Sequence, residues 1–528
     1  MYLNNWGLQN IFRKKKKKVV KESEEDIAVS PLPENSRILD EYWVYEPYAK
    51  IVIAEEKAGK RKYYVMEERL DAEERVLFEK LMSFMERELD PPTENVDREK
   101  YVISAAESLM NRYKRLKPAS EESKGKILYY VVRELVGFSH IHPIMLDPNI
   151  EDISCNGINM PIYVYHRYYE SLPTNIVFLK EDVLDDFIIR LAHQAGKHIS
   201  SAHPILDATL PGKHRLAATF MREVSNFGST FCIRKFRENP FSITELISMG
   251  TINKEMAAYL WILVENKMSI MVLGGTGAGK TTMLNAILSL IRPEVKIVTV
   301  EETAEMNISH ENWVPFISRE EFGFTGTRAT SVTLFDLVKT SLRYRPDYLI
   351  VGEIRGEEAY VLFQALATGH GGMSTMHADS LDYAIKRLTS PPMNISTIYL
   401  PLMNAWLHME RTTTSIKGAH KAVRRVRTIW ELDENGKYRV MAKWLPDKDI
   451  FQTFFEKSIL LEKISKKTGL TFDDVLSEMR RRAEYLENLI ERRVMSHREV
   501  SAAIRAYYMG KIKPIEVSLH DGDGDNGA

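Results

Sequence analysis

The chain has 528 residues, of which 44% are hydrophobic and 27% are charged, and its formal net charge is −1 at pH 7. This length is too great for one ordinary core, so two or three globular domains are expected. The neutral balance provides no basic excess for a phosphate backbone, which argues against nucleic acid as a partner. The only cysteines, Cys155 and Cys232, exclude a disulfide framework and a Cys-only zinc site, which indicates a reducing compartment.

Residues 1–36 are predicted to form a basic, disordered tail. Cations run without a break from Arg13 to Lys18 and acidic residues follow, and blocks of like charge repel themselves. Two interpretations stay open for the tail: it is solvated, or its basic run binds an anionic lipid surface, where each cation contributes on the order of 1 kcal/mol. No apolar run approaches the roughly 18–20 residues that span a bilayer, and no signal peptide is recognisable. We therefore expect a cytoplasmic protein, peripheral at the inner face of the cell membrane.

Two N-terminal α/β subdomains are predicted next, over residues 37–145 and 146–240. Alternating apolar residues indicate strands, and three- to four-residue periodicity indicates helices. The first subdomain is expected to have strands within 38–66 and helices at 71–89, 101–116 and 124–135. The second is expected to have strands in IEDISCNG and PIYVYH, a helix at 181–194, and strands at 215–219 and 230–236. Asn239 and Pro240 mark a linker after it.

Residues 241–515 are predicted to form a RecA-like ATPase domain with a C-terminal helical part, followed by a tail at 516–528. A helix near 242–249 leads into it. The segments SIMVLGG, KIVTVEE and DYLIVGE are continuously apolar strands, which is typical of a parallel sheet buried on both faces. Thr471 and Ser496 carry capping-box signatures for two helices near the end. The predicted class is therefore α/β.

A phosphate-binding loop lies between the first of these strands and a helix. Its sequence GGTGAGKT fits G-x-x-x-x-G-K-[ST], in which glycines let backbone N–H groups surround phosphates and the lysine reaches the β and γ phosphates. The hydroxyl of Thr281 is expected to coordinate Mg²⁺. The predicted nucleotide-binding residues are Gly274, Gly275, Thr276, Gly277, Ala278, Gly279, Lys280, Thr281 and Thr282.

Acidic residues follow the next two strands. Glu301, Glu302 and Glu305 come directly after KIVTV, at the strand end where open α/β sheets place ligands, and one of them is expected to activate water. Glu353 ends the strand DYLIVG as a Walker B carboxylate near Mg²⁺. Arg355 follows it and either contacts phosphate or balances the acids.

A glycine-rich stretch, TGHGGMSTMHA, carries His370 and His377. An imidazole here could sense the γ phosphate and transmit its loss to the sheet. A structural role for each histidine is the alternative, and no third ligand at helix spacing supports a metal site.

The order of these motifs resembles the secretion ATPase superfamily of type II secretion, type IV pilus and conjugation motors, over about residues 232–388. The segments IEDISCNG, VYHRYYESLPTNI, FCIRKF and HADSLDYAIKRLTSPPMNI are similar to its archaeal branch, the archaellum motor and the archaeal type IV pilus assembly ATPases. Altogether the resemblance extends over about residues 146–508.

The resemblance implies a homo-hexamer whose subunits bind ATP and Mg²⁺ between an N-terminal domain and the RecA-like domain. Hydrolysis would move the domains and push on a polytopic membrane platform protein that assembles or rotates a filament. The family's catalytic acid maps onto Glu305, its Walker B acid onto Glu353, and its histidine box onto His370 and His377. The family's N-terminal arginines have three candidates here, Arg215, Arg222 and Arg234.

Two features depart from the family pattern. Glu302 stands where aspartate is usual, and two cysteines cannot form the tetracysteine zinc insertion of many bacterial pilus relatives. Three other functions are compatible with a phosphate loop: a conjugation-type motor for DNA or protein, a RecA-like DNA-dependent ATPase, and a nucleotide-bound scaffold that does not hydrolyse. The near-neutral charge argues against the second, and the water-activating acids argue against the third.

Overall fold

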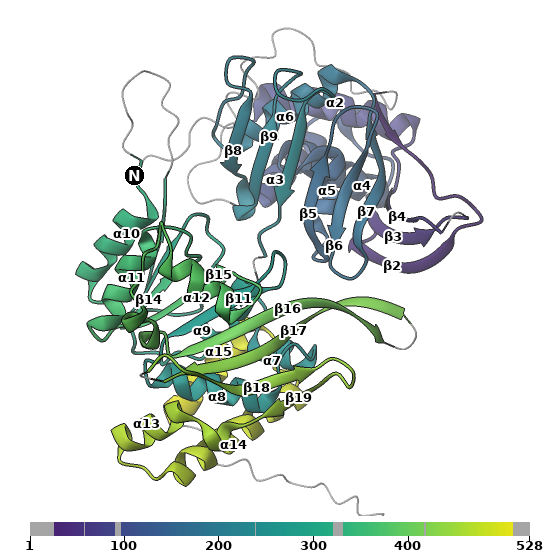
Figure 1. The fold of residues 1–528 in the computed structure, drawn as a ribbon. Helices are drawn as coiled ribbons and strands as arrows, with labels where there is room; N and C mark the ends of the chain where they lie inside the picture. The colour runs from purple at the N-terminus through teal and green to yellow at the C-terminus, as the bar shows by residue number, and fades with distance from the viewer. Residues whose placement is uncertain are drawn as a thin grey trace, which may run out of the picture. The chain divides into compact units, whose positions relative to one another are not determined.

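The computed structural model describes residues 26–57, 59–89, 97–237, 239–319, 331–416, 419–433 and 435–510. The chain divides into two compact units, Met1–Arg237 and Glu238–Ala528, each with its own sheet and core (Figure 1). The predicted basic run and the predicted tail at 516–528 lie outside the described residues. Within the described ranges, no helix is long and apolar enough to cross a membrane.

The first unit is built on a ten-stranded sheet in the order β2-β3-β4-β7-β6-β5-β10-β9-β8, with β1 paired to β7. Strands from both predicted N-terminal subdomains lie in this sheet, joined by one parallel pair, Tyr63 opposite Thr174. The strands are β1 (Ile27–Val29), β2 (Arg37–Tyr45), β3 (Ala49–Glu55), β4 (Arg61–Glu67), β5 (Ile150–Cys155), β6 (Pro161–His166), β7 (Glu170–Phe178), β8 (Ile205–Thr209), β9 (Arg215–Thr219) and β10 (Thr230–Arg234).

Strand β1 differs from the sequence-based expectation, which placed residues up to 36 in a disordered tail. Ile27 is buried and β1 runs antiparallel to β7, with Ile27 opposite Phe178. A strand of three residues is too short for an alternating apolar pattern to be recognised. Its partner, β7, also lies far along the chain, so no local pattern indicates the pairing.

Helices pack on the first unit's sheet and on one another. They are α2 (Ala72–Glu88), α3 (Arg98–Arg112), α4 (Glu121–Leu135), α5 (His142–Leu146) and α6 (Glu181–Gln194). Asp71 begins α2 with a capping box, in which its carboxylate accepts from backbone N–H groups while the Glu74 side chain accepts from the Asp71 N–H. Leu81, Met85 and Leu109 form part of a separate core where α2, α3 and α4 meet.

The second unit has a nine-stranded sheet in the order β13-β12-β14-β15-β11-β16-β17-β18-β19. The pairs from β13 to β16 are parallel, and those from β16 to β19 are antiparallel. The strands are β11 (Ile270–Gly274), β12 (Ile297–Glu301), β13 (Trp313–Ile317), β14 (Tyr348–Val351), β15 (Gly371–His377), β16 (Ala405–Ile416), β17 (Ala419–Leu432), β18 (Tyr438–Leu445) and β19 (Ile450–Thr453).

Helices cover both faces of the parallel part, as the apolar strands predict. Alternate residues of β11 enter different cores: Ile270 and Val272 join one, while Met271 and Leu273 join the other. The helices are α7 (Ile243–Ser248), α8 (Lys254–Glu265), α9 (Lys280–Leu288), α10 (Leu334–Ser341), α11 (Glu358–Ala367), α12 (Leu381–Thr389), α13 (Ile459–Thr468), α14 (Phe472–Glu491) and α15 (His497–Tyr508).

The predicted α/β class with a RecA-like phosphate-loop domain is confirmed. Helix α6 and strand β9 have the predicted bounds, and Thr471 and Ser496 cap α14 and α15 with capping boxes. The long hairpin of β16 and β17 was not predicted. It extends from the second unit as an arm in Figure 1.

The end of the first unit is held by a histidine. The backbone N–H of Phe236 donates to Nδ1 of His214 at 2.9 Å, and the ammonium of Lys235 donates to the carbonyl of Ile144 at 3.2 Å. Burial, reinforced by the cation of Lys235, lowers the pKa of His214 to about 4. The neutral ring is the form that accepts at Nδ1.

We expect the first unit to lose stability as pH falls from about 6.5 to about 4, because the unfolded His214 takes up a proton that the folded one refuses. Above that range its contribution is constant. The slope contributed by one such group approaches about 1.4 kcal/mol per pH unit. Urea unfolding across this range measures it.

The variant His214→Asn keeps an acceptor but no titrating ring, so its stability should fall less steeply with acid. His198→Asn changes an exposed histidine of the same unit and serves as the control. Equal slopes for the wild type and His214→Asn would contradict this assignment.

Candidate active site

The phosphate loop joins the end of β11 to the start of α9 and needs glycine at defined places. Gly274, Gly277 and Gly279 have φ of 151°, 69° and 90°, which L side chains rarely adopt. A Cβ at Gly274 would lie 2.5 Å from the carbonyl oxygen of Met409 on β16. The loop therefore packs closely against the backbone of β16 and ends at the N-terminus of α9. Such an arrangement favours the binding of anions.

Lys280 is the first residue of α9 and is 7% exposed. Its ammonium donates to the carbonyl of Gly275 at 2.9 Å and lies 3.3 Å from Nδ1 of His377. Burial lowers the pKa of Lys280, and the nearby carboxylates of Glu353 and Glu305 oppose that shift. A buried ammonium next to a carbonyl and an imidazole is well placed to pair with an anion.

The acidic segment after β12 is folded back by Glu301. This residue is 2% exposed, and its Oε1 accepts the backbone N–H groups of Glu305 at 2.9 Å and Met306 at 2.8 Å. The turn brings Oε2 of Glu305 to 3.0 Å from the hydroxyl of Thr281, which donates to it. The structure thus separates the acids by role: Glu301 shapes the turn, and Glu305 faces the phosphate loop.

Glu353 follows β14 and contacts the histidine at the end of β15. Its Oε1 lies 3.4 Å from Nε2 of His377, and its Oε2 accepts from Arg355 at 2.8 Å. Arg355 also lies 3.4 Å from Oε2 of Glu302. Arg355 therefore balances these two carboxylates, the second of the roles left open by the sequence.

The surroundings of His377 favour its neutral form. Burial and then the cation of Lys280 lower the pKa of His377, while Glu353 acts in the opposite direction. Arg387 of α12 donates to the His377 carbonyl and fixes the end of β15. A neutral imidazole between an ammonium and a carboxylate can both accept and donate a hydrogen bond.

The structure does not bring His370 to this cluster, which corrects the expectation that both histidines serve the nucleotide. His377 stands opposite Gly274 at the carboxyl end of β15, whereas Gly371 stands opposite Tyr348 at the amino end. His370 precedes that amino end and contacts the hydroxyl of Thr368 at 2.9 Å. A strand of seven residues spans about 20 Å, so the histidines lie at opposite edges of the sheet.

The three candidate arginines lie in the first unit. Arg215 and Arg234 stand opposite each other on β9 and β10, and pair with Asp207 at 2.9 Å and Asp152 at 3.2 Å. Arg222 follows the other end of β9 and pairs with Glu181. Their contact with nucleotide stays a prediction.

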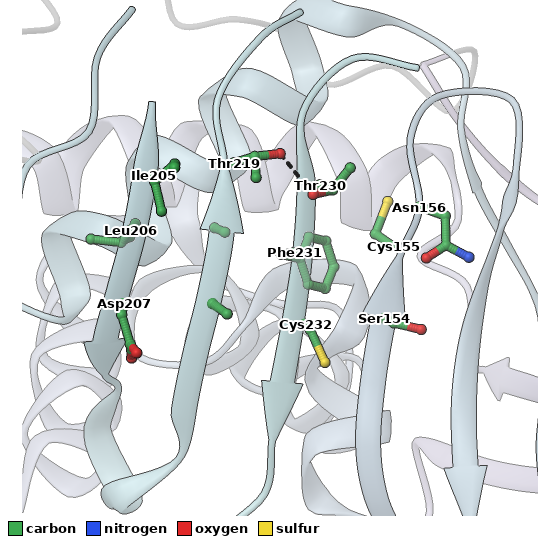
Figure 2. Close-up of a pocket in the computed structure, with 12 residues that line it drawn as sticks. Ser154, Cys155, Asn156, Ile205, Leu206, Asp207, Thr219, Thr230, Phe231 and Cys232 are labelled. Atoms are coloured by element: carbon green, nitrogen blue, oxygen red, sulfur yellow. Dashed lines mark hydrogen bonds between the residues drawn. The ribbon is translucent and has the colours of Figure 1, made fainter. Parts of the chain in front are cut away.

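The same strands line a hollow of about 440 Å³ (Figure 2). Its lining includes the small side chains of Ala217 and Cys232, and Thr219 and Thr230 share a hydrogen bond of 2.7 Å. Asp207, the partner of Arg215, is also part of the lining.

Sequence reasoning missed four residues near the loop. The position of a Cβ on Gly275 would be 3.4 Å from Oδ1 of Asp379, and Nε of Arg424 donates to the carbonyl of Gly277 at 2.9 Å. Arg411 and Arg387 complete the set. Asp379 follows the TMHA segment directly, which is a usable signal, whereas Arg411 and Arg424 reach the loop through strand pairing that no local pattern reveals.

The donors fit the phosphates and Mg²⁺ of a nucleotide. Mg²⁺ usually binds one or two protein oxygens and takes the rest from phosphate and water. The hydroxyl of Thr281 and the carboxylates of Glu305 and Glu353 supply such oxygens beside the phosphate cradle.

Residues 139–410 match the family described as Type II/IV secretion system protein. An uncharacterised protein of Methanocaldococcus jannaschii is 39% identical over 396 residues, which are 73% of this chain and 70% of that protein. A second protein of that organism is 44% identical over 47% of this chain and 90% of its own length. A protein of Mycobacterium tuberculosis described as a conjugal transfer protein is 35% identical over 39% of this chain and 60% of its own length.

Solved structures of similar chains superpose poorly on this chain as a whole. The ATPase DotB of Legionella pneumophila is 18% identical, with a TM-score of 0.41 over 68% of this chain and 92% of its own. The VirB11 ATPase of the Brucella suis type IV secretion system is 21% identical, with a TM-score of 0.27 over 56% of this chain and 96% of its own.

Proposed function

Because this chain belongs to the type II/IV secretion system protein family, we propose that it hydrolyses ATP as a hexameric motor. The motor would power assembly or rotation of a pilus-like filament, the archaellum or an archaeal pilus, or secretion through a polytopic membrane platform protein. One observation carries the proposal: Lys280, Glu305 and Glu353 meet beside Thr281 and His377 at the carboxyl edge of one parallel sheet. Phosphoryl transfer needs this combination of cation, metal-binding oxygen and water-activating acid.

Each residue then has a chemical task. The backbone N–H groups of the loop and the ammonium of Lys280 hold the phosphates. The Thr281 hydroxyl and the Glu353 carboxylate would hold Mg²⁺, which supplies positive charge to the phosphate oxygens when it is bound. Glu305 orients the attacking water and accepts its proton, and the neutral ring of His377 hydrogen-bonds the γ phosphate. Loss of that phosphate would release the ring, whose strand ends beside the loop.

A conjugation-type motor that moves DNA or protein is the second candidate. It is favoured by the relative from Mycobacterium tuberculosis that is described as a conjugal transfer protein. A DNA-dependent ATPase of the RecA type has less support, because the formal net charge of −1 provides no excess for a phosphate backbone. We propose that the protein acts in the cytoplasm, as a peripheral protein at the inner face of the cell membrane.

We expect Glu305→Gln to lower kcat by about 10²–10⁴-fold, because an amide cannot accept the proton of water. Binding of ADP should persist, since the phosphate loop is unchanged. Glu302→Gln removes a neighbouring carboxylate whose partner is Arg355 and is the matched comparison, with a loss below about tenfold. Steady-state phosphate release measures both. An equal loss in the two variants would remove Glu305 from the role of base.

The partner on which the motor acts can be identified by which molecule raises the rate of ATP hydrolysis. Vesicles of anionic lipid or the platform protein should raise ATP turnover, while single-stranded DNA should leave it unchanged.

Deleting residues 1–25 removes the basic run but keeps β1 in the sheet, so basal turnover should stay and vesicle co-sedimentation should fall. Stimulation of tenfold or more by DNA, with none by lipid, would favour the second candidate.

A further inference from the structure

Two arginines stand side by side on the long hairpin of the second unit. Strand β16 has 12 residues and β17 has 14, and in their register Arg411 is directly opposite Arg424. Directly opposed residues of an antiparallel pair project from the same face, where like charges destabilise each other. A cationic pair in that place needs negative charge or dipoles close by.

The face that carries this pair meets the phosphate loop. Nε of Arg424 donates to the carbonyl of Gly277 at 2.9 Å, and its Cδ lies 3.2 Å from where a Cβ of Gly279 would be. A terminal nitrogen of Arg411 lies 3.8 Å from the corresponding position of Gly277. Both side chains thus border the middle of the loop, where glycines leave the backbone accessible.

A bulge in β17 directs the hairpin to this place. The register with β17 shifts between His408 and Met409, immediately before the arginine strand segment. Bulges bend and twist a strand and so redirect the side chains beyond them. The carbonyl of Met409 also occupies the space that a Cβ of Gly274 would need, so the hairpin and the loop fit closely.

The neighbouring arginines of the hairpin contact acidic side chains. Arg425 pairs with Asp449 at 2.8 Å, and Arg427 lies 3.3 Å from Glu410 and over the ring of Trp444. In the first unit, the opposed pair of Arg215 and Arg234 is balanced by two aspartates. One contact of the Arg424 guanidinium is with a carbonyl of the phosphate loop.

We propose that Arg411 and Arg424 form a cationic clamp of the nucleotide site, which holds the phosphate loop and neutralises the phosphate chain of a bound nucleoside diphosphate or triphosphate. In this clamp, the hydrogen bond from Arg424 holds the Gly277 carbonyl, and the N–H groups of the loop face the phosphates. Both arginines lie beyond residue 410, where the match to the family ends. The clamp rests on the proposed nucleotide site but makes a claim about binding, not hydrolysis.

Equilibrium binding of Mg-ADP to the purified full chain tests the clamp. Arg411→Ala and Arg424→Ala should each raise the Kd by about tenfold, the loss expected for one charge-assisted contact. Arg424→Lys keeps the charge and should recover most of that loss. Arg427→Ala, from the same hairpin, should bind as the wild type does. Circular dichroism and thermal unfolding verify that each variant is folded.

The possible outcomes separate this proposal from the proposed function. If the alanine variants bind Mg-ADP within twofold of the wild type, the clamp is wrong, and so it is if Arg424→Lys is as weak as Arg424→Ala. If the wild type binds Mg-ADP and releases no phosphate from ATP, the motor proposal fails while the clamp is judged by the Kd values alone. A wild-type chain that binds no Mg-ADP would overturn both.

Discussion

The site depends on one buried carboxylate. Glu301 ends β12 inside the protein, and by accepting two backbone N–H groups it turns the following segment back towards α9. Burying a carboxylate is costly unless it is hydrogen-bonded, and these two bonds offset part of that cost at its Oε1. Gly352, which directly follows the neighbouring strand β14, makes room, because a Cβ there would lie 3.3 Å from Cγ of Glu301. Without this turn, Glu305 would not meet Thr281.

Sequence reasoning found the parts of the site that are local in the chain. The phosphate loop, the acidic segment and the strand that ends at Glu353 each carry their signal within about ten residues, and parallel strands bring their carboxyl ends to one edge. The histidine pair shows where motif spacing misleads. His370 and His377 are close in sequence, but they lie at opposite ends of β15, an extended strand of seven residues.

The features that the sequence did not reveal depend on long-range pairing. The hairpin of β16 and β17 is rich in threonine and arginine, so it lacks the apolar pattern of a buried strand. Its register, and with it the opposition of Arg411 and Arg424, is set by a bulge that only the pairing shows. In the same way, the strands predicted as two N-terminal subdomains share one sheet through a single parallel contact. Local patterns predict elements well and their partners poorly.

Phosphate release from Mg-ATP by the purified full chain tests the central claim most directly, with Lys280→Ala as its comparison. The account predicts steady release by the wild type and a loss of at least about a hundredfold in the variant, since the variant lacks the one buried ammonium of the loop. Far-ultraviolet circular dichroism should show the same fold for both proteins. Equal rates for the two, or no release by a wild-type chain that is folded and supplied with Mg²⁺, would contradict the account.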